Sequence, residues 1–160
     1  MSPMSIPPIG QSYRGVEGRS GYLLRQAWRV LEGAMEIALR PHGLTPPQYG
    51  VLTVLAREPD ASGADLARAV HTTPQAMNGV LATLEREALI ERRPHPTHGR
   101  ILQATLTSEG QRRLEAANPS IRALERATER DLSSDEIATV KTWLVATAQR
   151  LERITESRAA

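Results

Sequence analysis

Two amide side chains that could contact base edges stand three residues apart in the segment Thr73-Pro74-Gln75-Ala76-Met77-Asn78. Gln and Asn can each form paired hydrogen bonds with adenine N6 and N7 in the major groove, and the methyl group of Ala76 could touch a thymine methyl. A helix start at Thr73 would also favour a phosphate there. Gln75 and Asn78 could equally be ordinary solvated residues. The candidate DNA contacts in this part of the chain are Ser62, Thr72, Thr73, Gln75, Ala76 and Asn78.

A basic cluster lies further along the chain, where the stretch from Arg92 to Arg100 holds three arginines, two histidines and no acid. Arg100 is the candidate for insertion into a narrow minor groove, which concentrates negative potential. Neighbouring side chains point to opposite faces of a strand, so we expect only one of Arg92 and Arg93 to face DNA. A solvated charge cluster is the alternative. The candidate phosphate contacts are Arg92, Arg93, His95 and His98.

The pair His95-x-x-His98 suggests a metal site, with His42, His71 or Glu91 as further ligands. A structural zinc site normally needs four ligands, the chain has no cysteine, and prolines flank His95. We therefore expect no metal. Histidine titrates near neutral pH, which leaves a pH-responsive tip open.

Composition and missing motifs argue against most other classes of function. The 160 residues carry a net charge of +2, and 24% of them are charged, as in an ordinary globular protein. We find no glycine-rich phosphate loop, no Gly-x-Ser-x-Gly motif and no carboxylate pair in a recognisable pocket context. The beginning of the chain has no secretory signal pattern, and no apolar run approaches ~20 residues. We expect a cytoplasmic protein that is not an enzyme and needs no cofactor.

Helical periodicity and helix-start signals indicate the elements that position these residues. Two short helices separated by about three residues, the second entered through Thr-Pro, form a helix-turn-helix pattern. Residues 101–107 then alternate between apolar and polar side chains, as a strand does, so the basic cluster forms the tip of a β-hairpin. The predicted helices are one over 19–40, one opened by a Thr45-x-x-Gln48 capping box, and two short ones capped by Ser62 and Thr73.

Two long helices are expected to close the chain. The first runs from Ser108 to about Arg130 and is expected to bend at Asn118-Pro119, and the second begins with a Ser133-x-x-Glu136 capping box. Apolar residues in the second step by three and four, which is the pattern of a helix-on-helix seam broken once at Thr147. The candidate dimerisation residues are Ile137, Val140, Leu144, Leu151 and Ile154.

This order of elements resembles the MarR family of bacterial winged-helix regulators over about residues 19–157. Three segments carry the resemblance: GLTPPQYGVLTVL, then ASGADLARAVHTTPQAMNGVLATLEREALIERR, then HGRILQATLTSEG. The chain departs from the family pattern at three positions. His98 stands where the hairpin, called the wing, usually has an aspartate, and Gly79 stands where the second short helix often has a longer residue. Ala88 replaces the glycine that is often found after that helix.

The resemblance implies a mainly α fold with a small β-hairpin wing, in which a winged helix-turn-helix lobe is joined to N- and C-terminal dimerisation helices. The proline, glycine and serine content of residues 1–18 predicts a flexible arm. The divisions implied for the rest are a first dimerisation helix over 19–44, a DNA-binding lobe over 45–110 and dimerisation helices over 111–160. In this family, small molecules, often aromatic acids, bind between the lobe and the dimerisation helices. The candidate ligand residues are Arg25, Trp28, His42 and Tyr49, although Trp28 could instead be core or dimer packing.

We therefore expect a homodimeric repressor that binds double-stranded DNA at a pseudo-palindromic operator and is released by a small aromatic or phenolic acid. Two recognition helices about 34 Å apart would read two half-sites. A winged-helix module that binds a protein partner and an architectural DNA binder without sequence preference remain alternatives.

Overall fold

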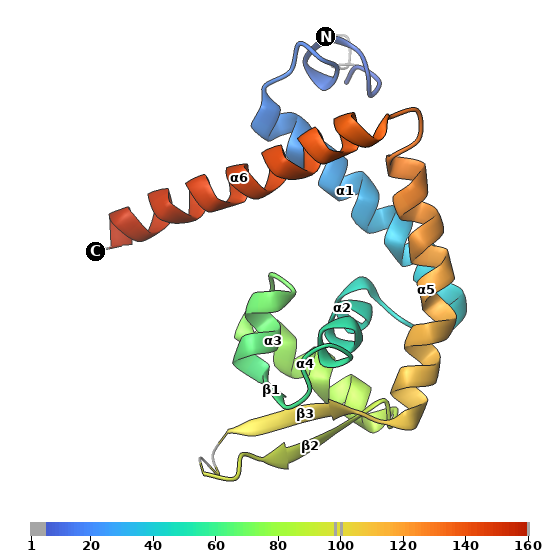
Figure 1. Cartoon of the computed structure of the whole chain (residues 1–160), viewed down its shortest axis with the longest axis vertical. Coiled ribbons are helices and arrows are strands. Elements are labelled where there is room, and N and C mark those ends of the chain that lie inside the picture. Colours follow the sequence, from blue (N-terminus) through green and yellow to red (C-terminus); the bar gives the residue numbers. More distant parts are fainter. Residues whose placement is uncertain (1–5, 98, 100, 160) are drawn as a thin grey trace, which may run out of the picture. The chain divides into compact units, whose positions relative to one another are not determined.

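The computed structural model describes residues 6–97, 99 and 101–159, and the chain divides into two units, Met1–Leu124 and Glu125–Ala160. Each unit is described by itself. Figure 1 shows mostly helices with one small sheet. The elements are η1 (Ser12–Arg14), α1 (Ser20–Leu39), η2 (Arg40–His42), α2 (Pro46–Leu55), β1 (Ala61–Ser62), α3 (Gly63–Ala69), α4 (Pro74–Arg86), β2 (Ile90–Pro94), β3 (Leu102–Leu106), α5 (Ser108–Thr128) and α6 (Ser134–Ala159).

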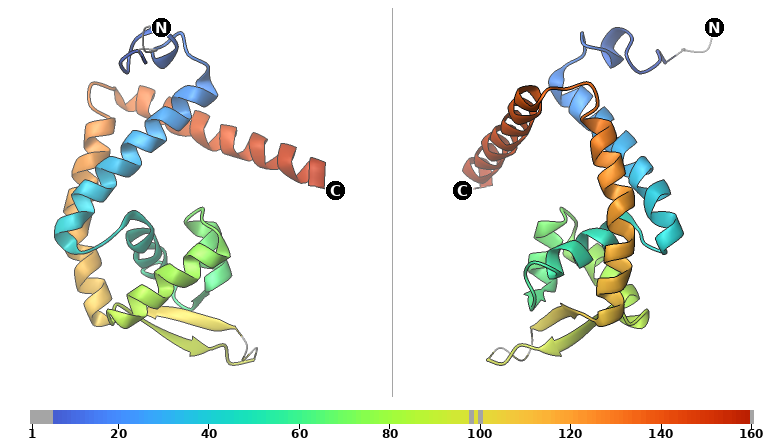
Figure 2. Two further views of the ribbon diagram at one scale, coloured as in Figure 1. Left: turned by 180° about the vertical axis from the view of Figure 1, so that it is seen from behind. Right: turned by 45° about the vertical axis from the view of Figure 1, so that its right-hand side comes forward.

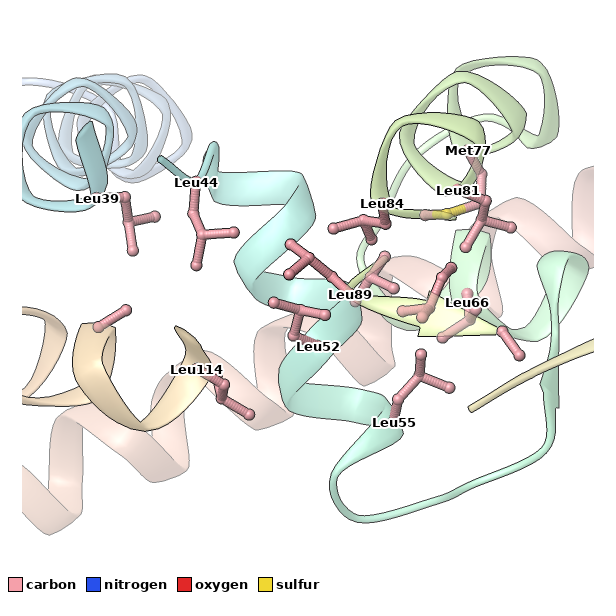
Figure 3. Packing of buried hydrophobic residues seen from close by; sticks show 14 of the residues in the cluster. Leu39, Leu44, Leu52, Leu55, Leu66, Met77, Leu81, Leu84, Leu89 and Leu114 are labelled. Atoms are coloured by element: carbon pink, nitrogen blue, oxygen red, sulfur yellow. The ribbon is translucent and has the colours of Figure 1, made fainter. Parts of the chain in front are cut away.

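The core of the first unit is built from apolar side chains, mostly leucines, that five helices, the sheet and the adjoining loops contribute. Figure 3 shows Leu52 on α2 among Leu66, Leu84 and Leu89 from the helix pair and the wing, while Leu39 and Leu114 lie at the other end of the cluster. All of these residues are buried. The capping box predicted for α2 is confirmed, because the Thr45 N–H donates to Gln48 Oε1 at 2.8 Å.

The sheet has three antiparallel strands in the order β1-β3-β2. The hairpin of β2 and β3 was predicted, and its register pairs Ile90 with Leu106 and Pro94 with Leu102. Proline is tolerated there because β2 is an edge strand. The third strand was not predicted, since the two residues of β1 are too few to show alternation. The expected winged helix fold is confirmed.

Residues 6–18, which belong to the arm that was expected to be flexible over 1–18, contact α1. Arg14 joins this N-terminal segment to α1 by donating from Nε to Gln26 Oε1 at 2.9 Å, and Gln26 Nε2 donates back to the Arg14 carbonyl at 3.1 Å. Tyr13 meets Tyr22 edge to face, with ring centroids 5.6 Å apart. These contacts join the segment to α1, and the flexibility of residues 1–18 stays a prediction.

A tight junction, formed by Ala88, Thr107 and Gly110, connects the end of α4 to the start of α5. Thr107 Oγ1 donates to the Ala88 carbonyl at 2.7 Å and accepts from the Gly110 N–H at 3.0 Å. A Cβ on Gly110 would lie 2.0 Å from the Leu89 carbonyl oxygen, so only glycine fits. Ala88 has a left-handed backbone with φ of 56°. The junction therefore holds α4, the hairpin of β2 and β3 (the wing) and α5 together. In the expected helix-turn-helix, α4 is the recognition helix.

Replacing Ala88 with glycine should stabilise the protein, because a non-glycine residue in the left-handed region costs about 1–2 kcal/mol. Glycine removes this cost, but its greater freedom in the unfolded chain offsets about 0.5–1 kcal/mol of the gain. We expect a net gain of about 0.5–1 kcal/mol in the free energy of unfolding, measured by urea denaturation. The matched control is Ala69→Gly, at the last residue of α3, which should not stabilise. An Ala88→Gly variant that unfolds at lower urea than the unchanged protein would contradict this expectation.

The second unit contains the end of α5 and the whole of α6. The capping box predicted for the start of α6 is confirmed. The Ser133 N–H donates to Glu136 Oε2 at 2.8 Å and the Ser133 hydroxyl donates to the same oxygen at 2.7 Å, while the Glu136 N–H donates to Ser133 Oγ at 3.3 Å. These hydrogen bonds from Ser133, its hydroxyl first, lower the pKa of Glu136. Lys141 pairs with Glu129 at 2.6 Å, which connects α6 to the turn that follows α5.

Candidate nucleic-acid interface

Two helix-start caps set the positions of α3 and α4. The Asp65 N–H donates to Ser62 Oγ at 3.2 Å, and the Ala76 N–H donates to Thr73 Oγ1 at 3.1 Å. Ser62 also donates its hydroxyl proton to the Asp65 carboxylate, and hydrogen bonds from Ser62, with a contribution from Arg68, lower the pKa of Asp65. The Ser62 proton is therefore used inside the protein. No described residue accepts the Thr73 hydroxyl proton, so Thr73 can donate it elsewhere.

The helix α4 has one buried face and one exposed face, as the sequence predicted. Met77, Leu81 and Leu84 are buried against α2, α3 and the wing. The residues exposed near the start of the helix are Thr73, Gln75, Ala76, Asn78 and Gly79. A Cβ on Gly79 would meet no atom within 4 Å, so this glycine leaves open space on the exposed face. Thr72, in the turn before the helix, is half-buried.

The two wing arginines differ in their surroundings. Arg92 is mostly buried, with 23% of its side chain exposed, and its Nε donates to Glu85 Oε2 of α4 at 2.9 Å. Arg93 is 77% exposed and pairs with Glu91 on the same strand at 2.7 Å. Arg92 thus fixes the wing against the recognition helix, while Arg93 reaches into solvent. Figure 2 shows the hairpin extending past α4 at one end of the first unit.

The tip of the wing is described only in part. The Thr97 N–H donates to His95 Nδ1 at 3.1 Å, and His95 is half-buried. The predicted contacts at His98 and Arg100 lie outside the described residues. The His95 N–H donates to the Ile101 carbonyl at 2.7 Å and closes the hairpin. The regular ladder over Leu102–Leu106 agrees with the expected alternation, with Ala104 buried and Leu102 exposed because the core ends before the tip.

The four candidate ligand residues do not lie together in the first unit. His42 Nε2 lies 3.1 Å from Ser120 Oγ, and the Tyr49 hydroxyl donates to Asn118 Oδ1 at 2.9 Å, so these two contact α5. Arg25 is near the other end of α1, about 20 Å away, since a helix rises ~1.5 Å per residue. Trp28 is 55% exposed, so it is not a core residue of this chain.

The predicted seam on α6 is largely uncovered in the second unit. Ile137 is half-buried, and the other four candidate dimerisation residues, Val140, Leu144, Leu151 and Ile154, are exposed. Trp143 is also exposed beside the seam, and sequence analysis did not select it because it falls outside the three-and-four spacing. The first unit adds exposed apolar side chains on α1: Tyr22, Leu24, Trp28, Val30 and Ile37.

Within residues 6–97, 99 and 101–159, no three His, Asp or Glu side chains are grouped to hold a metal ion. No described helix is both long and apolar enough to cross a membrane.

A capped helix pair with a polar exposed second helix, followed directly by an antiparallel hairpin, defines the winged helix-turn-helix class of DNA-binding proteins. The sequence profile of the MarR family matches residues 42–101. The chain is 41% identical over 105 residues to the HTH-type transcriptional repressor Rv2887 of Mycobacterium tuberculosis, covering 66% of this chain and 76% of the relative. The chain belongs to the MarR family of transcriptional regulators.

Two solved structures extend the comparison. The M. tuberculosis MarR family protein Rv2887 in complex with p-aminosalicylic acid is 34% identical, with a TM-score of 0.66, covering 81% of this chain and 98% of that one. The transcriptional repressor CouR bound to a 23-mer DNA duplex has a TM-score of 0.77, covering 86% and 98% of the two chains, and at 22% identity it supports the fold alone.

Proposed function

We propose that the protein is a homodimeric transcriptional repressor that reads a pseudo-palindromic operator with α4 and the wing, and that a small aromatic acid releases it. The observation that carries the proposal is the face of α4: Gln75 and Asn78 are exposed beside a helix start, while the opposite face packs into the core. The relative Rv2887 is named a repressor, which supports the direction of regulation.

The exposed face of α4 has the donors and acceptors that base readout needs. Gln75 and Asn78 would each bind an adenine through paired hydrogen bonds, and Ala76 would meet a thymine methyl. The hydroxyl of Thr73 and the helix N-terminus would hold a phosphate, with Thr72 adjacent. Ser62 is the weakest member of the predicted set, because Asp65 already accepts its hydroxyl proton.

The wing would contact the phosphate backbone of the DNA that α4 binds. Arg93 is the more exposed of the two wing arginines. It could reach a DNA phosphate once its ion pair with Glu91 breaks. Arg92 instead holds the wing at a fixed angle to α4 through Glu85. His95, His98 and Arg100 complete the proposed wing contacts, and each phosphate neutralised would steepen the log–log salt dependence by about 0.9.

A second copy of the chain would cover the exposed apolar faces of α1 and α6. Isolated surface leucines are ordinary, but exposed valine, leucine and isoleucine at regular spacing on a long helix indicate a partner helix. Pairing the same faces across a twofold axis would place two α4 helices for successive major grooves.

The proposed release by an aromatic acid rests on the Rv2887 complex with p-aminosalicylic acid. A ligand lowers operator affinity only if it binds better to an arrangement of the two lobes that differs from the DNA-bound one. His42 and Tyr49 contact α5, so a ligand that binds beside them would change how the lobe packs on that helix.

Selection of bound sequences from a random DNA pool tests the proposal directly. We expect a palindromic motif whose half-site centres are about 10 base pairs apart, or a multiple of that spacing. Recovery of no motif, with equal competition by any DNA, would favour the architectural alternative. A chain that binds no DNA at low salt would favour the protein-interaction alternative.

Gln75→Ala and Asn78→Ala should each weaken operator binding and relax specificity at one base position. A paired contact is worth about 1–3 kcal/mol, and a dimer makes it twice, so we expect a loss of 30-fold or more. Titration of a labelled operator at fixed salt measures this loss. Gln149→Ala, at an exposed position on α6, is the matched control and should retain the original affinity. Unchanged affinity in both α4 variants would refute readout by this face.

A further inference from the structure

The middle of α5 contains a proline that weakens the hydrogen bonding of the helix. Pro119 lies inside Ser108–Thr128 and has no N–H to donate to the Glu115 carbonyl, so the main-chain ladder lacks one hydrogen bond at this point. Helices bend most readily where the ladder is interrupted in this way. The direction of the part of α5 that follows Pro119 therefore depends on side-chain contacts near the proline.

Two polar side chains hold α5 on either side of Pro119. The Tyr49 hydroxyl of α2 donates to Asn118 Oδ1 at 2.9 Å, and His42 Nε2 of η2 lies 3.1 Å from Ser120 Oγ. The turn after α1 and the helix α2 thus both reach α5 at the proline (Figure 1). The four side chains that make these contacts belong to half-buried residues, whereas Pro119 itself is exposed.

Asn118 and Ser120 lie on opposite edges of the buried face of α5. Because a helix turns about 100° per residue, Asn118 lies to one side of the line through Ala117 and Ile121, and Ser120 lies to the other side. Apolar packing is non-directional, so on its own it would let the helix roll or tilt. Two directional hydrogen bonds from opposite edges oppose both movements. The buried residues of this face are Gly110, Leu114, Ala117 and Ile121.

We propose that His42 and Tyr49 fix α5 at Pro119 and thereby set the half-site spacing that the dimer accepts. The inference rests on the proposed dimeric repressor and names residues that determine one part of its specificity. The proposed DNA-binding lobe joins the proposed dimerisation helices at two points, the turn after α1 and α5, and the two hydrogen bonds lie where these points meet. Both are positioning residues, since they contact α5 and act on DNA only through the placement of α4.

The geometry of DNA gives the physical reason for this role. One additional base pair between the half-sites moves the second half-site by about 3.4 Å and turns it by about 35° around the duplex. The second α4 can follow only if α5 changes its direction relative to the lobe, and this change breaks the hydrogen bonds at Asn118 and Ser120. Their free energy is therefore part of what the protein uses to discriminate against operators of altered spacing.

The test compares operators that differ only in spacing. The palindrome selected from the random pool is resynthesised with its half-sites one or two base pairs closer or farther apart, and each duplex is titrated at fixed salt. In the double variant Tyr49→Phe with Ser120→Ala, we expect the discrimination between the original and the altered spacings to fall about tenfold. Two hydrogen bonds of ordinary strength, which no longer have to be broken, account for a change of that size.

Two further variants separate positioning from general loss of structure. Tyr13→Phe with Ser20→Ala removes the same two kinds of hydroxyl from exposed residues outside α5 and should keep the original discrimination. Ser120→Thr keeps the hydroxyl and should keep it as well. A purely structural role would lower the affinity for every spacing by one factor and leave the discrimination unchanged.

A second measurement uses the protein without DNA. The sequence has no cysteine, so Ala82→Cys, at an exposed position of α4, gives each protomer one spin label at a defined place. We expect the distance distribution between the two labels of the dimer to broaden in the Tyr49→Phe, Ser120→Ala background. The Tyr13→Phe, Ser20→Ala background should leave the distribution as it is.

An unchanged spacing profile, an equal loss of affinity at all spacings, or an unchanged distance distribution would each overturn the inference. Its failure is distinguishable from failure of the proposed function. A chain that selects a palindrome but shows one of these three results keeps its function and loses only the role of His42 and Tyr49. A chain that selects no palindrome loses the proposed function, and the inference falls with it.

Discussion

Replacing both Leu144 and Leu151 with aspartate will convert the protein to monomers and lower operator affinity by 100-fold or more. The two leucines lie on the proposed seam of α6 and are exposed in the single chain. Aspartates there would place like charges opposite one another across a twofold axis and remove apolar area from the interface. A monomer loses the gain of about 10²–10⁴ that comes from binding two half-sites at once.

Sedimentation or light scattering gives the mass, and operator titration gives the affinity. The control carries two aspartates on the opposite side of the same helix, Thr142→Asp with Gln149→Asp, and should remain dimeric. Helix content should be unchanged in both variants, because both pairs of positions are exposed. A seam variant that keeps the dimeric mass would show that α6 pairs through another face or does not pair.

Replacing Gly110 with alanine will destabilise the first unit by about 3 kcal/mol and lower its melting temperature by about 6–12 °C. The new Cβ would lie 2.0 Å from the Leu89 carbonyl oxygen and 3.1 Å from Leu106 Cδ2. The Leu89 carbonyl also accepts the Thr107 N–H at 3.1 Å, so moving it away breaks that hydrogen bond. The junction between α4, the wing and α5 cannot absorb the change locally.

Thermal and urea denaturation measure this loss. Gly79→Ala is the matched control, because Gly79 is also a helical glycine but its Cβ would meet nothing within 4 Å. Alanine there should stabilise the helix by about 0.5–1 kcal/mol. The same substitution thus has opposite signs at two glycines, and a Gly110→Ala protein as stable as the unchanged one would disprove the tight junction.

Features set by nearby residues were predictable from the sequence. Thr45, Ser62, Thr73 and Ser133 each cap the helix that they were expected to cap, since a cap needs only the next three residues. The buried face of α4 was predicted because its apolar spacing matches one side of a helix. The wing hairpin followed from alternation in one strand.

Features that depend on distant partners were not predictable. Nothing near Arg92 shows that Glu85 on another element will bind it, and only the fold reveals that it supports the wing. The hydrogen bond of Arg14 with Gln26 joins the N-terminal segment to α1, and the composition of the segment gives no sign of that partner. The four candidate ligand residues were grouped by their chemistry, and the length of α1 separates them.

The pairing of β2 with β3 is complete at Pro94 and Leu102, and β3 is joined on its other side to β1, which leads directly into α3. None of the described residues between Pro94 and Leu102 belongs to the buried core that orients the helix pair. Loops of other lengths and charges can be exchanged at this point while the rest of the lobe keeps its geometry. A protein engineer can therefore use the hairpin end as a graft site without redesigning α3 or α4.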